Sequence, residues 1–284
     1  MIWLTEPLQY PFMQSALITG LAVSIVCALL SCYLVLKGWS LMGDAISHAV
    51  LPGVVLSSLF AIPLFIGAFT SGLACAVLTG YIKEHSRLKE DTVMGIVFSG
   101  MFAIGLVMFT HVETDQHLMH ILFGNILGIP EDLMWQTLAV CAAVAVTTLL
   151  FYKDLLMVCF DKSHARVVGL NIRALHYLLL ILIALVTVAA IQVVGVVLVV
   201  AMLVGPGVVA LMLCRRFEVM MLVATLVSVF STLAGVVISY HIDGSTSACI
   251  VLVQATLFIT AFSGKQLSPI KNMAGLKVNV ADKA

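Results

Sequence analysis

Runs of about 18 or more apolar residues recur along the whole chain, and this repetition restricts the fold more than any other feature of the sequence. The runs lie at about residues 12–36, 41–60, 62–82, 92–110, 134–152, 175–192, 194–214, 217–239 and 245–263. A water-soluble chain of 284 residues could not bury them all, since 62% of its residues are hydrophobic and only 10% are charged. The sequence therefore predicts an all-α, polytopic membrane protein with eight or nine transmembrane helices.

The basic residues indicate how the helices are oriented. With nine spans, all 14 Lys and Arg residues fall on one side of the membrane, whereas the opposite loops carry acidic residues and histidines. The positive-inside rule assigns the basic side to the cytoplasm. The N-terminus is then outside and the C-terminus inside, with residues 1–264 forming the membrane domain and 265–284 a partly disordered cytoplasmic tail. A formal net charge of zero gives no reason to expect a nucleic-acid partner.

Asp44 and His48 place a carboxylate and an imidazole inside the second apolar run. Four residues apart on a helix, they share one face and can share a cation or a hydrogen bond. Ionisable residues within a membrane span are costly and usually functional. Together they offer ligands suited to Mn²⁺, Fe²⁺ or Zn²⁺. The alternative is structural: Asp44 would cap the second helix, and His48 would be a hydrogen-bonded, buried side chain.

Two prolines are predicted to interrupt spanning helices. Pro52 lies in the short second span, which would then be broken or partly re-entrant. Pro206, between Gly205 and Gly207, should bend or break the seventh span, because proline removes a helical N–H and its ring clashes with the preceding turn. Such a kink would serve either as part of a gate or only as a structural bend.

The one long cytoplasmic connection, 153–174, contains a predicted short helix along the membrane surface. Asp161 is a suitable N-cap, and Ala165, Val168 and Gly169 would form a face of small residues that a partner could approach closely. An ordinary interfacial connector is the alternative. On the other side, the loop 111–133 holds several acidic residues and histidines, which would be either metal ligands or part of a hydrated loop. Residues 118–129 would form a short surface helix there.

Four segments of the chain, in order, resemble the manganese/zinc/iron permeases of ABC importers. The first runs from Lys37-Gly-Trp-Ser through Asp44 and His48 to Pro52-Gly53, and the second is Leu122-Phe-Gly-Asn-Ile-Leu127. The third runs from Phe160 to Leu170, and the fourth from Gly195 to Gly207. The resemblance covers residues of about 10 to 263 and therefore nearly the whole chain.

The resemblance implies a membrane-spanning permease subunit in the bacterial inner membrane, which receives a divalent metal ion from an extracytoplasmic binding protein. The implied partners are a second permease subunit and a cytoplasmic ATP-binding subunit. Asp44 and His48 match the family's metal-coordinating pair. The residues that match its ATPase-docking segment are Phe160, Asp161, Ala165, Arg166, Gly169 and Leu170. The motif most resembles the manganese/iron branch, so Mn²⁺ or Fe²⁺ is favoured over Zn²⁺, with no permanently bound cofactor.

The residues agree with a transport subunit that is not itself an enzyme. The only Gly-Lys pair, Gly264-Lys265, is followed by Gln266 and lacks the P-loop pattern, so energy would come from a partner. An intramembrane metalloprotease would need H-E-x-x-H, which is absent. The remaining alternatives are an ATP-independent, ion-coupled secondary transporter and a permease for iron chelates or cobalamin.

Overall fold

The computed structural model describes residues 10–110 and 128–281, which form helices and their connections. The helices are α2 (Pro11–Lys37), α3 (Met42–Phe60), α4 (Leu64–His85), α5 (Glu90–Phe109), α7 (Glu131–Leu150), α8 (Tyr152–Phe160), α9 (Lys162–Val167), α10 (Ile172–Val194), α11 (Val196–Leu213), α12 (Phe217–Ile242) and α13 (Thr246–Ala281). Within the described residues, nine of these are long and apolar enough to cross a membrane. The prediction of an all-α membrane protein with eight or nine spanning helices is confirmed.

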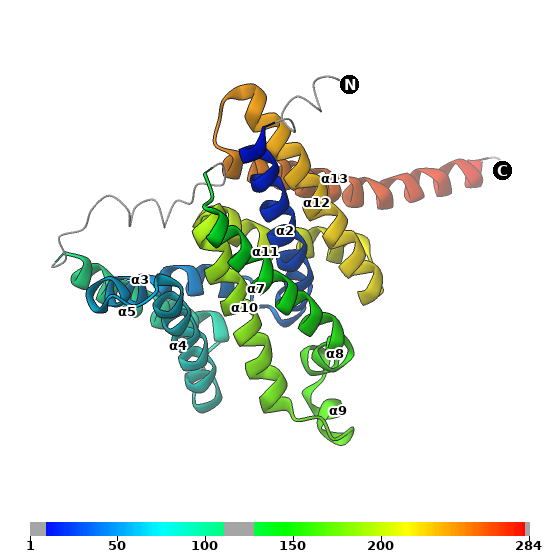
Figure 1. Cartoon of the computed structure of the whole chain (residues 1–284). Coiled ribbons are helices and arrows are strands. Elements are labelled where there is room, and N and C mark those ends of the chain that lie inside the picture. The colour runs from blue at the N-terminus through cyan, green and yellow to red at the C-terminus, as the bar shows by residue number, and fades with distance from the viewer. Residues whose placement is uncertain (1–9, 111–127, 282–284) are drawn as a thin grey trace.

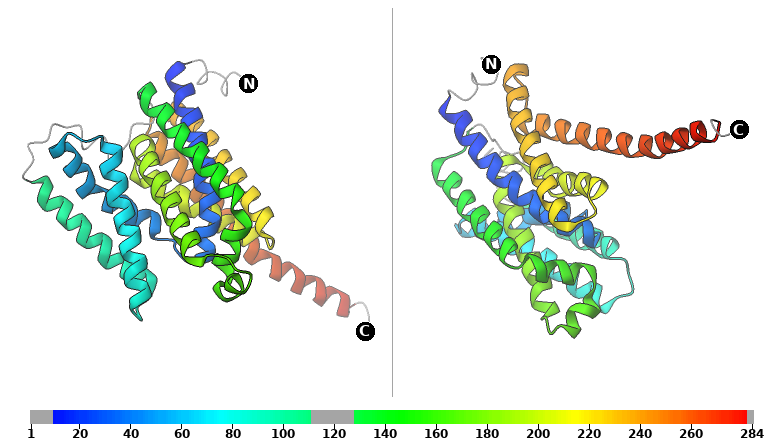
Figure 2. Two further views of the ribbon diagram at one scale, coloured as in Figure 1. Left: turned by 60° about the horizontal axis from the view of Figure 1, so that its bottom comes forward. Right: turned by 90° about the vertical axis from the view of Figure 1, so that its right-hand side faces the viewer.

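The limits of the spans follow hydropathy closely. Each of the first eight spanning helices begins and ends within three residues of its predicted limit. The ninth, α13, continues as helix to Ala281 and extends away from the other helices (Figures 1 and 2). This extension includes most of 265–284, the predicted cytoplasmic tail.

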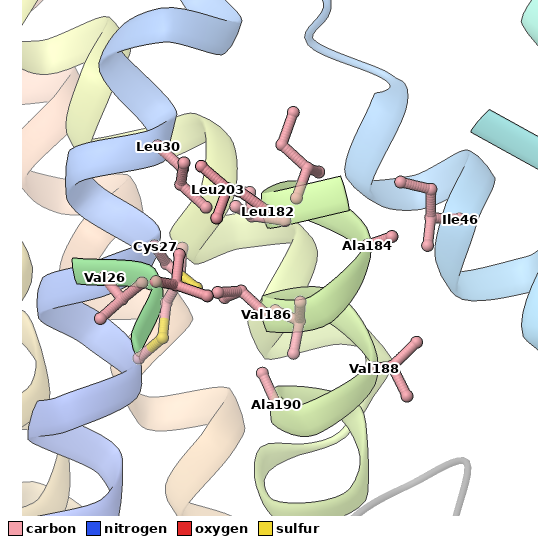
Figure 3. Packing of buried hydrophobic residues seen from close by; sticks show 14 of the residues in the cluster. Val26, Cys27, Leu30, Ile46, Leu182, Ala184, Val186, Val188, Ala190 and Leu203 are labelled. Carbon is pink, nitrogen blue, oxygen red and sulfur yellow. The ribbon is translucent and has the colours of Figure 1, made fainter. Parts of the chain in front are cut away.

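Two groups of helices make up the membrane domain. In Figures 1 and 2, α3, α4 and α5 lie together on one side, and α2, α7, α11, α12 and α13 lie on the other. Between them runs α10, one of the most buried spans. Figure 3 shows Ala184 and Val188 of α10 on the side of Ile46, whereas Val186 points toward Val26 of α2. The α10 helix thus joins the two groups through its opposite faces.

Small residues hold α3 and α4 in backbone contact. A Cβ atom built on Gly53 of α3 would lie 2.0 Å from the carbonyl oxygen of Gly67 in α4. Beside this crossing, the Ser71 hydroxyl donates a 2.6 Å hydrogen bond to the carbonyl of Ala49. Small residues allow close helix packing in membranes, where apolar burial adds little between helices. The crossing fixes α3, which carries Asp44 and His48, against α4.

Neither proline breaks its helix. Pro52 lies inside a continuous α3, which corrects the expectation of a broken or re-entrant span. Pro206 lies inside a continuous α11. At that point the Gly207 N–H donates to the Ser31 hydroxyl of α2 at 2.9 Å, and the same hydroxyl donates to the Val204 carbonyl at 3.3 Å. A serine of a neighbouring helix thus pairs with backbone groups around the proline, which lets the helix continue.

Candidate functional site

Asp44 and His48 face each other along α3. The Nε2 atom of His48 lies 3.4 Å from the Oδ1 atom of Asp44, and their side chains retain 35% and 40% exposure for Asp44 and His48 respectively. Both groups therefore keep part of their surface open on this single chain. The i, i+4 spacing places the pair on one helix face, as the sequence predicts.

The alternative that Asp44 caps the second spanning helix is wrong. The N-cap of α3 is Leu41, and no side chain caps the helix. Asp44 lies in the first turn, where a negative charge interacts favourably with the helix dipole. The partial exposure of His48 likewise does not fit a buried imidazole. The carboxylate is therefore not used as a helix cap and remains available as a ligand.

Two aromatic rings of α5 enclose the imidazole of His48. Phe98 stacks at a centroid distance of 5.9 Å with 24° between the ring planes, and Phe102 meets the imidazole edge-on at 5.3 Å. These contacts limit the orientations of the ring and leave its Nε2 atom beside Asp44. Neither phenylalanine was predicted as a site residue, although their spacing of four residues places them on one face of α5.

The pair alone is an incomplete metal site. Within residues 10–110 and 128–281, no group of three or more His, Cys, Asp or Glu side chains could hold a metal ion. Two ligands bind a transition metal less firmly than a closed three- or four-ligand site. The predicted ligands of the loop 111–133 fall mostly on residues 111–127, outside the described residues, as do the motif at 122–127 and most of the surface helix at 118–129.

The helix α9 is defined by caps at both ends. The Asp161 carboxylate accepts hydrogen bonds from the backbone N–H groups of Ser163 at 2.7 Å and His164 at 3.2 Å. At the other end, Gly169 has a φ of +86°, and the N–H of Leu170 donates to the carbonyl of Ala165 at 3.1 Å. A left-handed glycine with this bond forms a Schellman motif. The predicted N-cap is confirmed.

The exposed face of α9 differs from the expected one. Ala165 is fully buried against the protein, so it cannot belong to a face open to a partner. The apolar side chains that do face outward are Phe160, Val167 and Val168, with exposed fractions of 73%, 86% and 55%. Arg166 is exposed beside them. The predicted face is therefore wrong at Ala165, whereas its other members, Val168 and Gly169, are exposed, and the exposed Val167 was missed.

Of the remaining predicted residues, only Pro52 lies near the Asp44–His48 pair. It is one turn beyond His48 on α3, at a cavity of about 280 Å³ also lined by Ser71, Met101 and Ile104. Gly205 of α11 packs against the Gln254 side chain of α13. The structure thus keeps Pro52 on the helix of the pair and places Pro206 and the α8–α9 segment on other parts of the fold.

Comparison with known proteins places this architecture in a family. Residues 9–265 match the model of the ABC 3 transport family. The chain is 58% identical to the chelated iron transport system membrane protein YfeD of Yersinia pestis, over 95% of this chain and 91% of that protein. It is 50% identical to the manganese transport system membrane protein MntB of a Synechocystis species, over 92% and 86% of the two chains.

Solved structures of ABC transporter membrane subunits share this fold. PsaBC from Streptococcus pneumoniae, in complex with Fab, superposes with a TM-score of 0.82 at 38% identity, covering 92% of this chain and 95% of that one. An inward-facing metal-chelate type ABC transporter gives a TM-score of 0.71 at 16% identity over 89% and 86% of the two chains, which indicates a shared fold only. The resemblance seen in the sequence is confirmed. This chain belongs to the ABC 3 transport family and is a multi-pass membrane subunit of an ABC transporter.

Proposed function

We propose that the chain is the permease subunit of an ATP-driven importer of a divalent transition-metal ion, with Mn²⁺ or Fe²⁺ favoured over Zn²⁺. The observation that carries the proposal is the Asp44–His48 pair, half open on one face of a spanning helix. A carboxylate and an imidazole suit these ions. The names of the relatives, which refer to iron and manganese, support the preference.

The metal passes through the membrane as cargo, and the chain holds no permanent cofactor. Two Asp44–His48 pairs, one from each of two permease subunits, would offer four ligands across the subunit interface. The second subunit is either another copy of this chain or a related permease. A site assembled from two halves binds loosely enough to release the ion, which transport requires.

The α8–α9 segment is the proposed docking site for a cytoplasmic ATP-binding subunit. Its support is the exposed apolar surface formed by Phe160, Val167 and Val168, beside the charged Arg166. Apolar side chains exposed on a surface segment are typical of protein interfaces. In this proposal, Asp161 and Gly169 cap α9, and Ala165 and Leu170 anchor it to the rest of the chain. The exposed side chains make the contact with the ATP-binding subunit.

The proposed location is the bacterial inner membrane, with the N-terminus outside and the C-terminus in the cytoplasm. This orientation places all 14 Lys and Arg residues on the cytoplasmic side. Residues 1–264 form the membrane domain, and 265–284 the cytoplasmic tail. An extracytoplasmic metal-binding protein would deliver the ion to the opposite side. Pro52, Gly205 and Pro206 are proposed gate positions.

A second candidate is transport of chelated iron, since the name of the relative YfeD refers to it. A bulky chelate has little use for a carboxylate–imidazole pair, because its iron already has its ligands. An ATP-independent secondary transporter is the other alternative, with Asp44 and His48 as an ion-coupling relay.

The test is uptake of ⁵⁴Mn²⁺ into proteoliposomes that hold the complete transporter, meaning this chain, its partner permease, the ATP-binding subunit and the metal-binding protein. The matched control contains an ATP-binding subunit that cannot hydrolyse ATP. We expect uptake only with the active subunit, and stronger competition by Fe²⁺ than by Zn²⁺. Uptake with the inactive subunit would favour the secondary transporter, and uptake of iron only as a chelate would favour the second candidate.

A further inference from the structure

The chain turns sharply between α2 and α3, and Trp39 lies at the corner. Gly38 adopts a φ of +73°, and the N–H of Trp39 donates back to the Leu34 carbonyl at 2.8 Å. These features form a Schellman motif at the end of α2. The Trp39 carbonyl then accepts the N–H of Met42, the first residue of α3, at 3.1 Å. One residue thus takes part in the end of α2 and the start of α3.

The side chain of Trp39 is locked between a cation and an imidazole. The ring is only 1% exposed, and the Lys37 ammonium lies 3.5 Å from its centroid. The same ammonium lies 2.9 Å from Nδ1 of His176 in α10. Since a lysine ammonium can only donate, Nδ1 accepts this hydrogen bond. His176 also meets Trp39 edge-on at 5.3 Å. We call Lys37, Trp39 and His176 the corner cluster.

The corner cluster adjoins the segment that leads to the docking helix. The Tyr33 hydroxyl, one turn before Lys37, donates to the Tyr152 carbonyl at the start of α8 at 3.3 Å. At the other end of α8, burial raises the pKa of the Cys159 thiol, while the charges of Lys37 and Lys162 lower it. Lys37, one turn after Tyr33, therefore lies on the part of α2 that packs against α8.

A contiguous path thus runs from α8 through the end of α2 to α3. Asp44 lies only five residues after Trp39, in the first turn of α3. The Trp39 Nε1 atom has no hydrogen-bond partner among the described residues, so packing and the lysine cation hold the ring. A cation over an aromatic face contributes about 0.5–2 kcal/mol without fixing the ring as a hydrogen bond would.

We propose that Lys37, Trp39 and His176 are positioning residues that transmit movement of the α8–α9 segment to the start of α3 and so to Asp44 and His48. This inference rests on the proposed function. Because the crossing with α4 holds α3 at Gly53, a shift at the first turn of α3 would tilt the segment that carries Asp44 and His48 relative to this crossing. The corner cluster itself does not touch the ion.

The test compares Lys37→Met with Lys37→Arg in the complete transporter in proteoliposomes. Methionine removes the cation and the donor to His176, whereas arginine keeps both. Lys89→Met is the control for losing one exposed charge at the same end of the helices. ATP hydrolysis and ⁵⁴Mn²⁺ uptake are measured on the same preparations, over a range of Mn²⁺ concentrations.

For Lys37→Met, we expect the maximal uptake per ATP hydrolysed to fall about tenfold, with the KM for Mn²⁺ unchanged. Lys37→Arg should restore most of the coupling, and Lys89→Met should behave as the wild type. Normal coupling in Lys37→Met, or a fall in uptake and hydrolysis in equal proportion, would overturn the inference. If the wild-type transporter itself showed no ATP-dependent uptake, the proposed function would fail instead.

Trp39→Phe is the second variant, which keeps an aromatic ring but reduces its volume. It is used if Lys37→Met does not co-purify with the ATP-binding subunit, and the same loss of coupling is expected. If neither Lys37→Met nor Trp39→Phe assembles while Lys37→Arg does, the corner cluster has only a structural role and the inference is wrong.

Discussion

Replacing Gly53 by alanine should separate α3 from α4. The new methyl carbon would lie 2.0 Å from the Gly67 carbonyl oxygen and 2.6 Å from the Ser71 Cβ atom. Ordinary contact begins at 3.4 Å, so the two helices must move apart by about 1.4 Å at this point. Neither neighbour is the end of a flexible side chain, so side-chain rotation cannot relieve the clash.

The cost follows from two opposing effects. Overpacking of a close contact costs about 1–3 kcal/mol, and a clash with backbone lies at the upper end of this range. Alanine in place of glycine within a helix gains about 1 kcal/mol. The net loss of stability for Gly53→Ala is therefore about 1–2 kcal/mol. The shift would also displace Ala49, whose carbonyl accepts the Ser71 hydrogen bond one turn after Asp44.

Gly100→Ala is the matched control, because a Cβ atom at this helical glycine of α5 has no neighbour within 4 Å. It should keep or slightly increase the stability. The assay is the apparent Tm of the purified transporter in detergent, followed by fluorescence, with metal uptake measured in parallel. A Tm of Gly53→Ala equal to or above that of Gly100→Ala would show that α3 and α4 do not depend on close contact at Gly53.

Three further predictions follow from hydrogen bonds and exposed side chains. Ser31→Ala removes the partner of the buried Gly207 N–H, so we expect the stability to fall by about 1–3 kcal/mol and the apparent Tm to be lower. An unchanged Tm would contradict the role of this serine beside the proline. Asp161→Ala should cost about 1 kcal/mol and speed amide exchange in the first turn of α9, and unchanged exchange would argue against the cap. Val167→Asp should weaken co-purification of the ATP-binding subunit, whereas Val219→Asp at an exposed position of α12 should not. Equal effects of the two variants would show that α9 is not part of the interface.

Hydropathy and short-range spacing predict much of this protein. The spans are recoverable because about 20 apolar residues cross the hydrocarbon core, whatever their neighbours are. The Asp44–His48 geometry and the Asp161 cap follow from spacings of two to four residues along one helix. Such local patterns are set by backbone geometry and survive in any fold that keeps the helix.

Features that depend on distant residues could not be predicted. The sequence predicts that Pro206 bends or breaks its helix. The helix does not break, and Ser31, far away in the sequence, pairs with the backbone around the proline. The orientation of Ala165 was wrong because a six-residue helix has too short a pattern to identify its buried face. The rings of Phe98 and Phe102 reach His48 only because α5 packs on α3.

Metal binding by Asp44 is tested by ⁵⁴Mn²⁺ uptake by the complete transporter with Asp44→Asn, compared with Asp91→Asn in the first turn of α5. Asparagine keeps the shape of the side chain and removes the charge that would bind the ion. We expect normal co-purification of all subunits in both variants, uptake abolished in Asp44→Asn and uptake unchanged in Asp91→Asn. Wild-type uptake in Asp44→Asn would contradict the metal site, and loss of assembly in that variant alone would give Asp44 a structural role instead.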